Sequence, residues 1–284
     1  MRARRRGGTV DPSFESREVI NRERKKDMSL KTVVLDIETV PNQMALDRLA
    51  AMRSEKAPEP GAYPKWILQR IVAASALCID ADSDRPEIGL TSWHRGKMSE
   101  EAIVAGVEAM LERANTLVTF NGRAHDLPVL RARALAAGWL AVPKIAGFRL
   151  PKATRHIDLS EELCGRGSAR PSLAEAAALL NLPAKRQLVG TSVPALAAAD
   201  NYERVARHCE SDVITTYLVH LHLRMSDAGA DEAVADASAT MAAWVKDCRV
   251  ERPHLQPFIV ACERMARLQP ADAQALPALD GLGF

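Results

Sequence analysis

The order of apolar and polar residues divides most of the chain into strands and helices. Short apolar or alternating stretches predict strands over residues 31–37, 70–80, 87–94 and 116–120. Amphipathic stretches predict helices over residues 43–53, 99–114, 126–138, 172–182 and 201–225. The first strands form a meander, and later strands alternate with helices. This order predicts an α/β fold, in which helices flank a mixed β-sheet.

Local signals support several predicted helix ends. Ser99 is a plausible N-cap followed by acidic residues, and Ser172 with Glu175 forms a capping box. Gly138 is placed to end the third helix. We expect a main domain over residues 30–225 and a helical extension over 226–284, which holds two more helices, packs on the same domain and ends in a loose Ala/Pro-rich segment.

Composition indicates a soluble globular chain. Of its 284 residues, 47% are hydrophobic and 26% are charged, which is ordinary for such proteins. No apolar run reaches the roughly 18 residues that a membrane span requires, and the basic N-terminus lacks the apolar core of a signal peptide. The five cysteines are scattered without CxxC pairing, which argues against a disulfide framework or a zinc site. We therefore expect a cytoplasmic protein with no membrane partner.

The net charge of +2 is distributed unevenly. Residues 1–30 contain nine Lys/Arg and five Asp/Glu, so the rest of the chain is slightly acidic. We interpret residues 1–29 as a basic, disordered tail, although translation from Met28 would also give a compact start. A nucleic-acid partner would therefore need a local basic surface.

Four carboxylates stand at the predicted ends of strands or within helices. Asp36 and Glu38 follow a buried strand at positions i and i+2, so their side chains point the same way and repel each other. Asp126 begins a helix, and Asp212 lies beside the apolar stripe of the long helix. Such oxygen ligands suit Mg²⁺ or Mn²⁺, and two ions about 3.5–4 Å apart can clamp the oxygens of a phosphodiester. Asp158, in contrast, is interpreted as a structural hydrogen-bonding residue.

Three segments carry a family resemblance. "DIETVP", "FNGRAHDLPVL" and "HCESDVITTYL" resemble, in order and spacing, the three motifs of the DEDD superfamily of exonucleases. The chain is most similar to bacterial predicted 3′–5′ exonucleases related to the proofreading domain of family-B DNA polymerases. The resemblance covers about residues 31–225, including the "HIDL" segment.

This resemblance implies a ribonuclease H-like fold and hydrolysis from a 3′ end with two Mg²⁺ or Mn²⁺ ions, releasing nucleoside 5′-monophosphates. It also implies that Asp36, Glu38, Asp126 and Asp212 are the metal ligands, with Glu38 near the terminal 3′-hydroxyl as well. Alternatives from the residues alone are a solvated strand end for the first pair, an N-cap for Asp126 and a surface charge for Asp212.

Two positions depart from the family pattern. One branch of the superfamily has Tyr four residues before the last Asp, and another has His five residues before it. This chain has His208 four residues before Asp212, which places both side chains on one helix face. A neutral imidazole can act as a general base, so we expect His208 to be catalytic and activity to fall as the pH drops through about 6.5. The alternative is a helix histidine without a role. His125 replaces a usual Phe and could contact a base or phosphate, or be a tolerated substitution.

We predict substrate contacts by Thr39, Asn121, Arg123 and His125, although the Asn-Gly pair at 121–122 also suits a simple turn. The local basic surface could be supplied by Lys144, Arg149, Lys152 and Arg155, which could equally belong to a solvated loop. The predicted activity is a 3′–5′ exonuclease acting on single-stranded 3′ ends, with DNA favoured over RNA, alone or with a polymerase or repair partner in trans. The alternative is a catalytically inactive nucleic-acid- or partner-binding module that keeps the fold.

Overall fold

The computed structural model describes most of the chain between residues 31 and 267. The described residues are 31–53, 63–80, 86–138, 141–150, 155–164, 169–183, 188, 190–227 and 230–267. The predicted N-terminal tail, the final Ala/Pro-rich segment and Lys152 lie outside these ranges.

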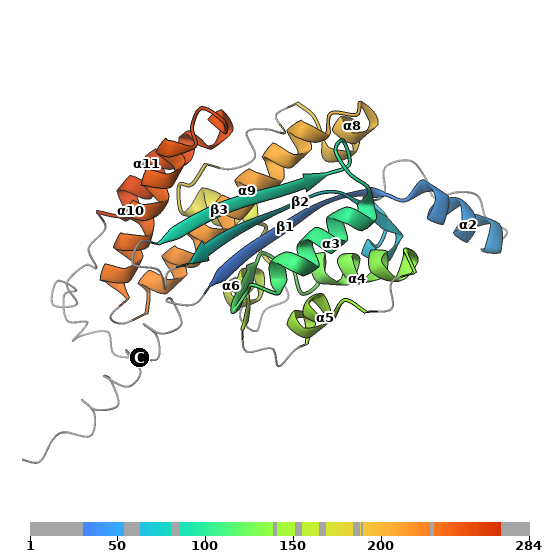
Figure 1. The fold of residues 1–284 in the computed structure, drawn as a ribbon, viewed down its shortest axis with the longest axis horizontal. Coiled ribbons are helices and arrows are strands. Elements are labelled where there is room, and N and C mark those ends of the chain that lie inside the picture. The colour runs from blue at the N-terminus through green and yellow to red at the C-terminus, as the bar shows by residue number, and fades with distance from the viewer. Residues whose placement is uncertain are drawn as a thin grey trace, which may run out of the picture.

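Within the described residues, five strands form one mixed sheet in the order β3-β2-β1-β4-β5 (Figure 1). The strands are β1 (Thr32–Pro41), β2 (Gln69–Asp80), β3 (Glu87–His94), β4 (Thr116–Thr119) and β5 (His156–Asp158). β1, β2 and β3 pair antiparallel, whereas β1, β4 and β5 pair parallel. This arrangement, a mixed sheet flanked by helices, confirms the predicted α/β fold class.

Helices cover both faces of the sheet, and each of the predicted ones is present. They are α2 (Gln43–Arg53), η1 (Trp66–Leu68), α3 (Glu100–Leu111), α4 (Asp126–Ala136), α5 (Pro143–Arg149), α6 (Leu159–Cys164), α7 (Leu173–Leu179), α8 (Val193–Ala198), α9 (Tyr202–Met225), α10 (Asp231–Asp247), η3 (Pro253–Leu255) and α11 (Pro257–Met265). The Ser99 cap and the capping box at Ser172 and Glu175 are confirmed. Among the described helices, none combines the length and apolarity needed to cross a bilayer.

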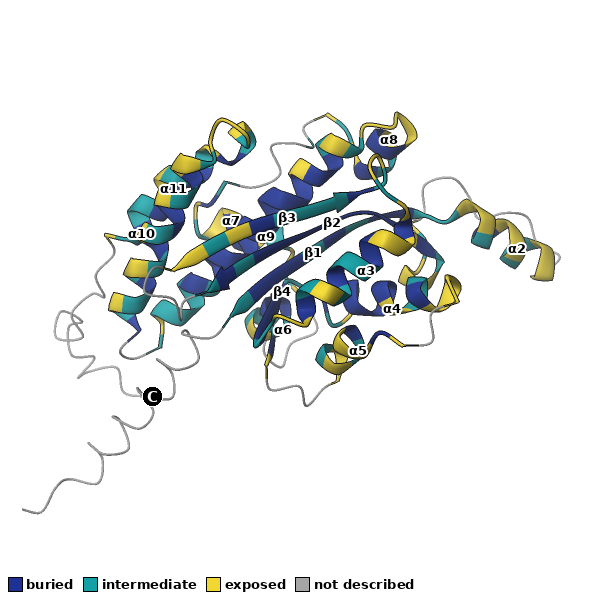
Figure 2. Ribbon diagram, viewed as in Figure 1, coloured by how far each residue is buried: buried dark blue, intermediate teal, exposed yellow. Residues whose placement is uncertain are grey.

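The two faces of the sheet have separate apolar cores. Alternate β1 residues such as Val33 and Leu35 pack with α3, α4 and α5 on one face. Val34, on the opposite face, packs with Leu77 of β2 and with α9. Figure 2 shows β1, β2 and the middle of α9 as mostly buried, whereas the edge strand β3 is partly exposed. The side chains of β1 therefore alternate between two helical layers, as period-two geometry requires.

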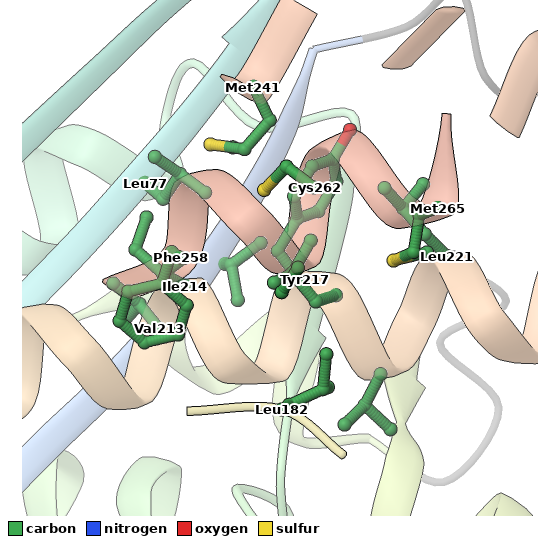
Figure 3. Close-up of a cluster of buried hydrophobic side chains, with 14 of the residues drawn as sticks. Leu77, Leu182, Val213, Ile214, Tyr217, Leu221, Met241, Phe258, Cys262 and Met265 are labelled. Carbon is green, nitrogen blue, oxygen red and sulfur yellow. The ribbon is translucent and has the colours of Figure 1, made fainter. Parts of the chain in front are cut away.

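The C-terminal helices pack against α9. Phe258, Cys262 and Met265 of α11 are buried together with Ile214 and Tyr217 of α9 (Figure 3). This shared core attaches residues 230–267 to the long helix whose other side contacts β1 and β2.

The pairing of β1 with β2 contains one irregularity. Glu38 lies opposite Ala73, but the next residue, Thr39, lies opposite Ile71, so β2 contains one extra residue at this point. Such a β-bulge bends a strand and redirects the side chains beyond it. The irregularity falls directly after the first acidic pair.

Candidate active site

The first acidic pair lies in the second half of β1, on the face that α9 covers. Asp36 is opposite Ser75 and Glu38 is opposite Ala73, so both side chains occupy the same face two residues apart. Strand β1 is central in the sheet, and its apolar residues anchor it on both faces. The backbone beneath these two carboxylates is therefore firmly held.

Helix α9 brings His208 and Asp212 to the same place. His208 Nε2 lies 3.5 Å from Glu38 Oε1 and 3.7 Å from Asp212 Oδ2. Only 4% of the His208 side chain is exposed. One potential ligand atom from each of Glu38, His208 and Asp212 lies within 4.8 Å of the others. The predicted i, i+4 pair on α9 thus faces Glu38 of β1.

Asp126 enters the site from the start of α4. The turn before it places Asn121 in the left-handed region with φ of 66°, which Asn tolerates better than most residues. Gly122 is required there, since a Cβ would lie 2.5 Å from Thr119 Oγ1. The N-cap of α4 is His125 and Asp126 is its first helical residue, so the alternative N-cap role is not found for Asp126.

The four carboxylates interact electrostatically with one another. Burial and the negative charges of Glu38, Asp126 and Asp212 raise the pKa of Asp36 well above its ordinary value. Burial also raises the pKa of Asp126, whose Oδ2 has no hydrogen-bond partner among the described residues. A divalent cation would relieve this repulsion and supply the missing partner. The donor set of carboxylate oxygens fits Mg²⁺ or Mn²⁺.

A glutamine that the sequence did not single out connects the first and second motifs. Gln69 Nε2 donates to Pro64 O at 2.7 Å, which directs Oε1 toward Thr39 Oγ1 at 2.6 Å and His125 Nε2 at 3.1 Å. Because Oε1 can only accept, His125 donates from Nε2. Gln69 is 4% exposed. Its Oε1 atom links Thr39, the residue after Glu38, to His125, the residue before Asp126.

His125 is also the positive neighbour of Asp126. Its Nδ1 lies 2.9 Å from Asp126 Oδ1. Burial opposes the charged ring, but the hydrogen bond and charge of Asp126 raise the pKa of His125 above its ordinary value overall. Thr39 and His125, predicted as substrate contacts, are therefore both engaged with Gln69, and His125 remains partly exposed.

The other predicted substrate contacts, Asn121 and Arg123, belong to the second motif. The backbone N–H groups of Asn121 and Arg123 donate to Asp158 at 2.8 and 2.9 Å, which confirms the structural role predicted for Asp158. The Arg123 guanidinium donates to Leu150 O at 3.1 Å and lies 3.2 Å from Glu161. It thus has protein partners already. The described members of the predicted basic surface, Lys144, Arg149 and Arg155, are all exposed.

An acidic cluster at one place on a mixed sheet, with a buried histidine between two of its carboxylates, defines an α/β protein with a candidate divalent-metal site. The comparison with known families is more specific. Residues 61–262 match the family described as predicted 3′–5′ exonucleases related to the exonuclease domain of PolB, and the chain belongs to this family. The match includes Asp126, His208 and Asp212. It begins after Asp36 and Glu38, which the structure brings beside them.

A solved structure and the curated proteins complete the comparison. A family B DNA polymerase from the hyperthermophilic archaeon Pyrobaculum calidifontis matches 78% of this chain with 15% identity and a TM-score of 0.45. The match covers 29% of the polymerase chain, so this protein spans less than a third of its length. No curated protein matches the chain.

Proposed function

We propose that this protein is a metal-dependent 3′–5′ exonuclease that removes nucleoside 5′-monophosphates from single-stranded nucleic acid, with DNA favoured over RNA. The observation that carries the proposal is the convergence of four carboxylates. Asp36 interacts with the charges of Glu38, Asp126 and Asp212, and His208 Nε2 lies 3.5 Å from Glu38 and 3.7 Å from Asp212. Membership of the exonuclease family supports the reaction class.

The four carboxylates would hold two Mg²⁺ or Mn²⁺ ions. When bound, the ions supply charge stabilisation to the attacking and leaving oxygens of the phosphodiester. Asp36, whose pKa is raised by burial and by the charges of the other three carboxylates, would be one of their ligands. Glu38 lies in the second half of β1 beside His208 and would also orient the terminal 3′-hydroxyl.

His208 would accept the proton of the attacking water. Its Nε2 atom faces Glu38 and Asp212, so the nitrogen that would hold the proton is directed into the site. A neutral imidazole is a far better base at pH 7 than a Tyr hydroxyl with its pKa of about 10. The terminal nucleotide would be surrounded by Thr39 of the first motif and by Asn121, Arg123 and His125 of the second motif.

A digestion series tests the activity. The substrates are 5′-labelled single-stranded DNA, duplex DNA, single-stranded RNA and circular single-stranded DNA, each with Mg²⁺ or Mn²⁺. We expect stepwise shortening of the linear strands from the 3′ end and no cleavage of the circle.

Two double variants complete the experiment. Asp36→Ala/Glu38→Ala should be inactive, whereas Asp47→Ala/Glu87→Ala, which removes two exposed carboxylates, should match the parent. Absence of cleavage by the parent with either metal would refute the proposal. If the parent still bound nucleic acid in that case, the result would favour the alternative of an inactive nucleic-acid-binding module. The replacement of Tyr by His208 would then accompany the loss of nuclease activity.

A further inference from the structure

A row of polar side chains crosses the sheet beneath α9. Asp36 of β1 is opposite Ser75 of β2, and Ser75 is opposite Ser92 of β3. Directly opposed residues on neighbouring strands project from the same face. The Ser75 and Ser92 hydroxyl oxygens lie 3.0 Å apart, which continues the row from the acidic site toward the edge strand.

Consecutive residues of α9 attach to the two ends of this row. The Cys209 thiol donates to Asp36 Oδ2 at 3.2 Å and to Asp36 O at 3.3 Å. At the other end, Ser92 Oγ donates to Glu210 Oε1 at 2.7 Å. Cys209 also has a hydrogen bond with Ser75, the middle member of the row. The helix that carries His208 and Asp212 is therefore fastened to the sheet by directional contacts.

The second oxygen of Glu210 is held by the C-terminal extension. His254 Nε2 lies 2.7 Å and Arg252 Nε lies 3.6 Å from Glu210 Oε2. Arg252 Nη2 also donates to Leu90 O of β3 at 3.1 Å. Glu210 is only 7% exposed, and a buried carboxylate is costly unless cations and hydrogen bonds compensate it. Residues after α10 supply that compensation.

Apolar packing does not by itself set the position of α9 accurately. The core between α9 and α11 (Figure 3) is non-directional and tolerates small rotations and shifts of a helix. Hydrogen bonds depend steeply on distance and angle. The row thus restricts the rotation of α9, and with it the approach of Asp212 and His208 to Glu38.

We propose that Glu210, held by His254 and Arg252, is a positioning residue for the metal site, so that the C-terminal extension forms a necessary part of it. Contacts run from the extension through Glu210, Ser92, Ser75 and Cys209 to Asp36. This inference rests on the proposed function, because it takes the acidic cluster to be a site for divalent ions. Residues that orient metal ligands commonly change metal affinity about 10–100-fold when replaced.

The test measures Mn²⁺ binding to the metal-free full-length protein by electron paramagnetic resonance of the free ion, without nucleic acid. His254→Ala should weaken binding roughly tenfold, and His254→Gln, which keeps a side-chain donor, should recover most of that loss. The matched control is Lys246→Ala, which removes a 2.6 Å ion pair to Glu263 within the same extension. It should leave the Mn²⁺ affinity unchanged. Ser92→Ala, which cuts the row from the sheet side, provides a second variant should His254→Ala fail to fold.

Nuclease assays and thermal melting separate positioning from general stability. For His254→Ala we expect the half-saturating Mn²⁺ concentration to rise while the rate at saturating Mn²⁺ stays near that of the parent. A lowered melting temperature with unchanged Mn²⁺ affinity would show a merely structural role and overturn the inference, with the proposed function intact. A parent protein that neither binds Mn²⁺ nor cleaves would overturn both.

Discussion

Replacing Asp212 with Asn should stabilise the metal-free protein while abolishing its nuclease activity. The change keeps the size of the side chain and removes one charge from the acidic cluster. Asp212 is among the residues that raise the pKa of Asp36, and its carboxylate lies within 4.8 Å of that of Glu38. Without metal, this proximity opposes folding. A site arranged for binding or catalysis is commonly kept at the expense of stability in this way.

The magnitude follows from the geometry. Two unit charges 4.8 Å apart repel by about 3.5 kcal/mol at an effective dielectric constant of about 20. The Asp212 and Glu38 side chains are 12% and 14% exposed, so solvent screens part of this repulsion in the parent. We therefore expect a net gain of about 1–2 kcal/mol in the free energy of unfolding at pH 8.

The assay is chemical unfolding in EDTA, with Asp158→Asn as the matched control. The control makes the same chemical change at another buried Asp, whose carboxylate accepts backbone N–H groups of Asn121, Arg123 and Ser160 at 2.8, 2.9 and 3.2 Å. It should lose about 2–3 kcal/mol, since hydrogen bonds to a charged acceptor are replaced by weaker or missing ones. The two variants should therefore move in opposite directions.

Adding Mg²⁺ should make the parent more stable than Asp212→Asn. The parent gains stability by binding the ion in its folded state, whereas Asp212→Asn has lost a ligand and gains less. An Asp212→Asn protein that is no more stable than the parent in EDTA would refute the electrostatic reasoning. A change of the free energy of unfolding in the same direction for Asp212→Asn and Asp158→Asn would also refute it.

Three further predictions concern single histidines and the linking glutamine. His208→Ala should lower kcat by about 10²–10⁴-fold and remove the acid limb of the pH–rate profile, and unchanged turnover would exclude a catalytic role. Gln69→Leu should reduce activity, because Thr39 and His125 lose their shared hydrogen-bond partner. Steady-state kinetics would measure the activity and circular dichroism would show that the variant is folded; full activity would show that the link is dispensable. Burial lowers the pKa of His156 to about 4. Since the unfolded chain then binds more protons than the folded one between about pH 6.5 and 4, stability should fall by roughly 3 kcal/mol as the pH drops through this window. His156→Gln should flatten that dependence in unfolding titrations, and an unchanged slope would contradict it.

The sequence predicted the elements whose signals are local. The apolar run of β1 and the capping signals at Ser99 and Ser172 act within a few residues, and all of them appear in the structure. The spacing of His208 and Asp212 is likewise a local property of a helix, so their shared direction could be predicted. Ordered motifs allowed the separate carboxylates to be grouped before any contact was known.

Contacts between distant parts of the chain were not predictable in the same way. Gln69 and His125 are 56 positions apart. Gln69 is a polar residue at the start of a strand, and no periodic pattern in the sequence indicates that it contacts His125. The approach of His254 to Glu210 likewise depends on how α10 and α11 pack on α9. β5 has only three residues, too few to show a strand period, and takes its form from pairing with β4.

The irregularity between Glu38 and Thr39 gives strand β2 two functions. Gln69 and Ser75 are six positions apart, so in a regular strand both would point toward α9. Because β2 has one extra residue at the bulge, Gln69 instead points toward α4, where it meets His125, while Ser75 continues the row from Asp36. Deleting Val72 would remove the bulge and leave the present partners in place, with Ile71 opposite Thr39 and Ala73 opposite Glu38, so Gln69 would still face α4. The extra residue thus accounts for how one strand serves two layers: Gln69 joins the first and second motifs on the α4 face, and Ser75, an even number of positions later, lies on the α9 face.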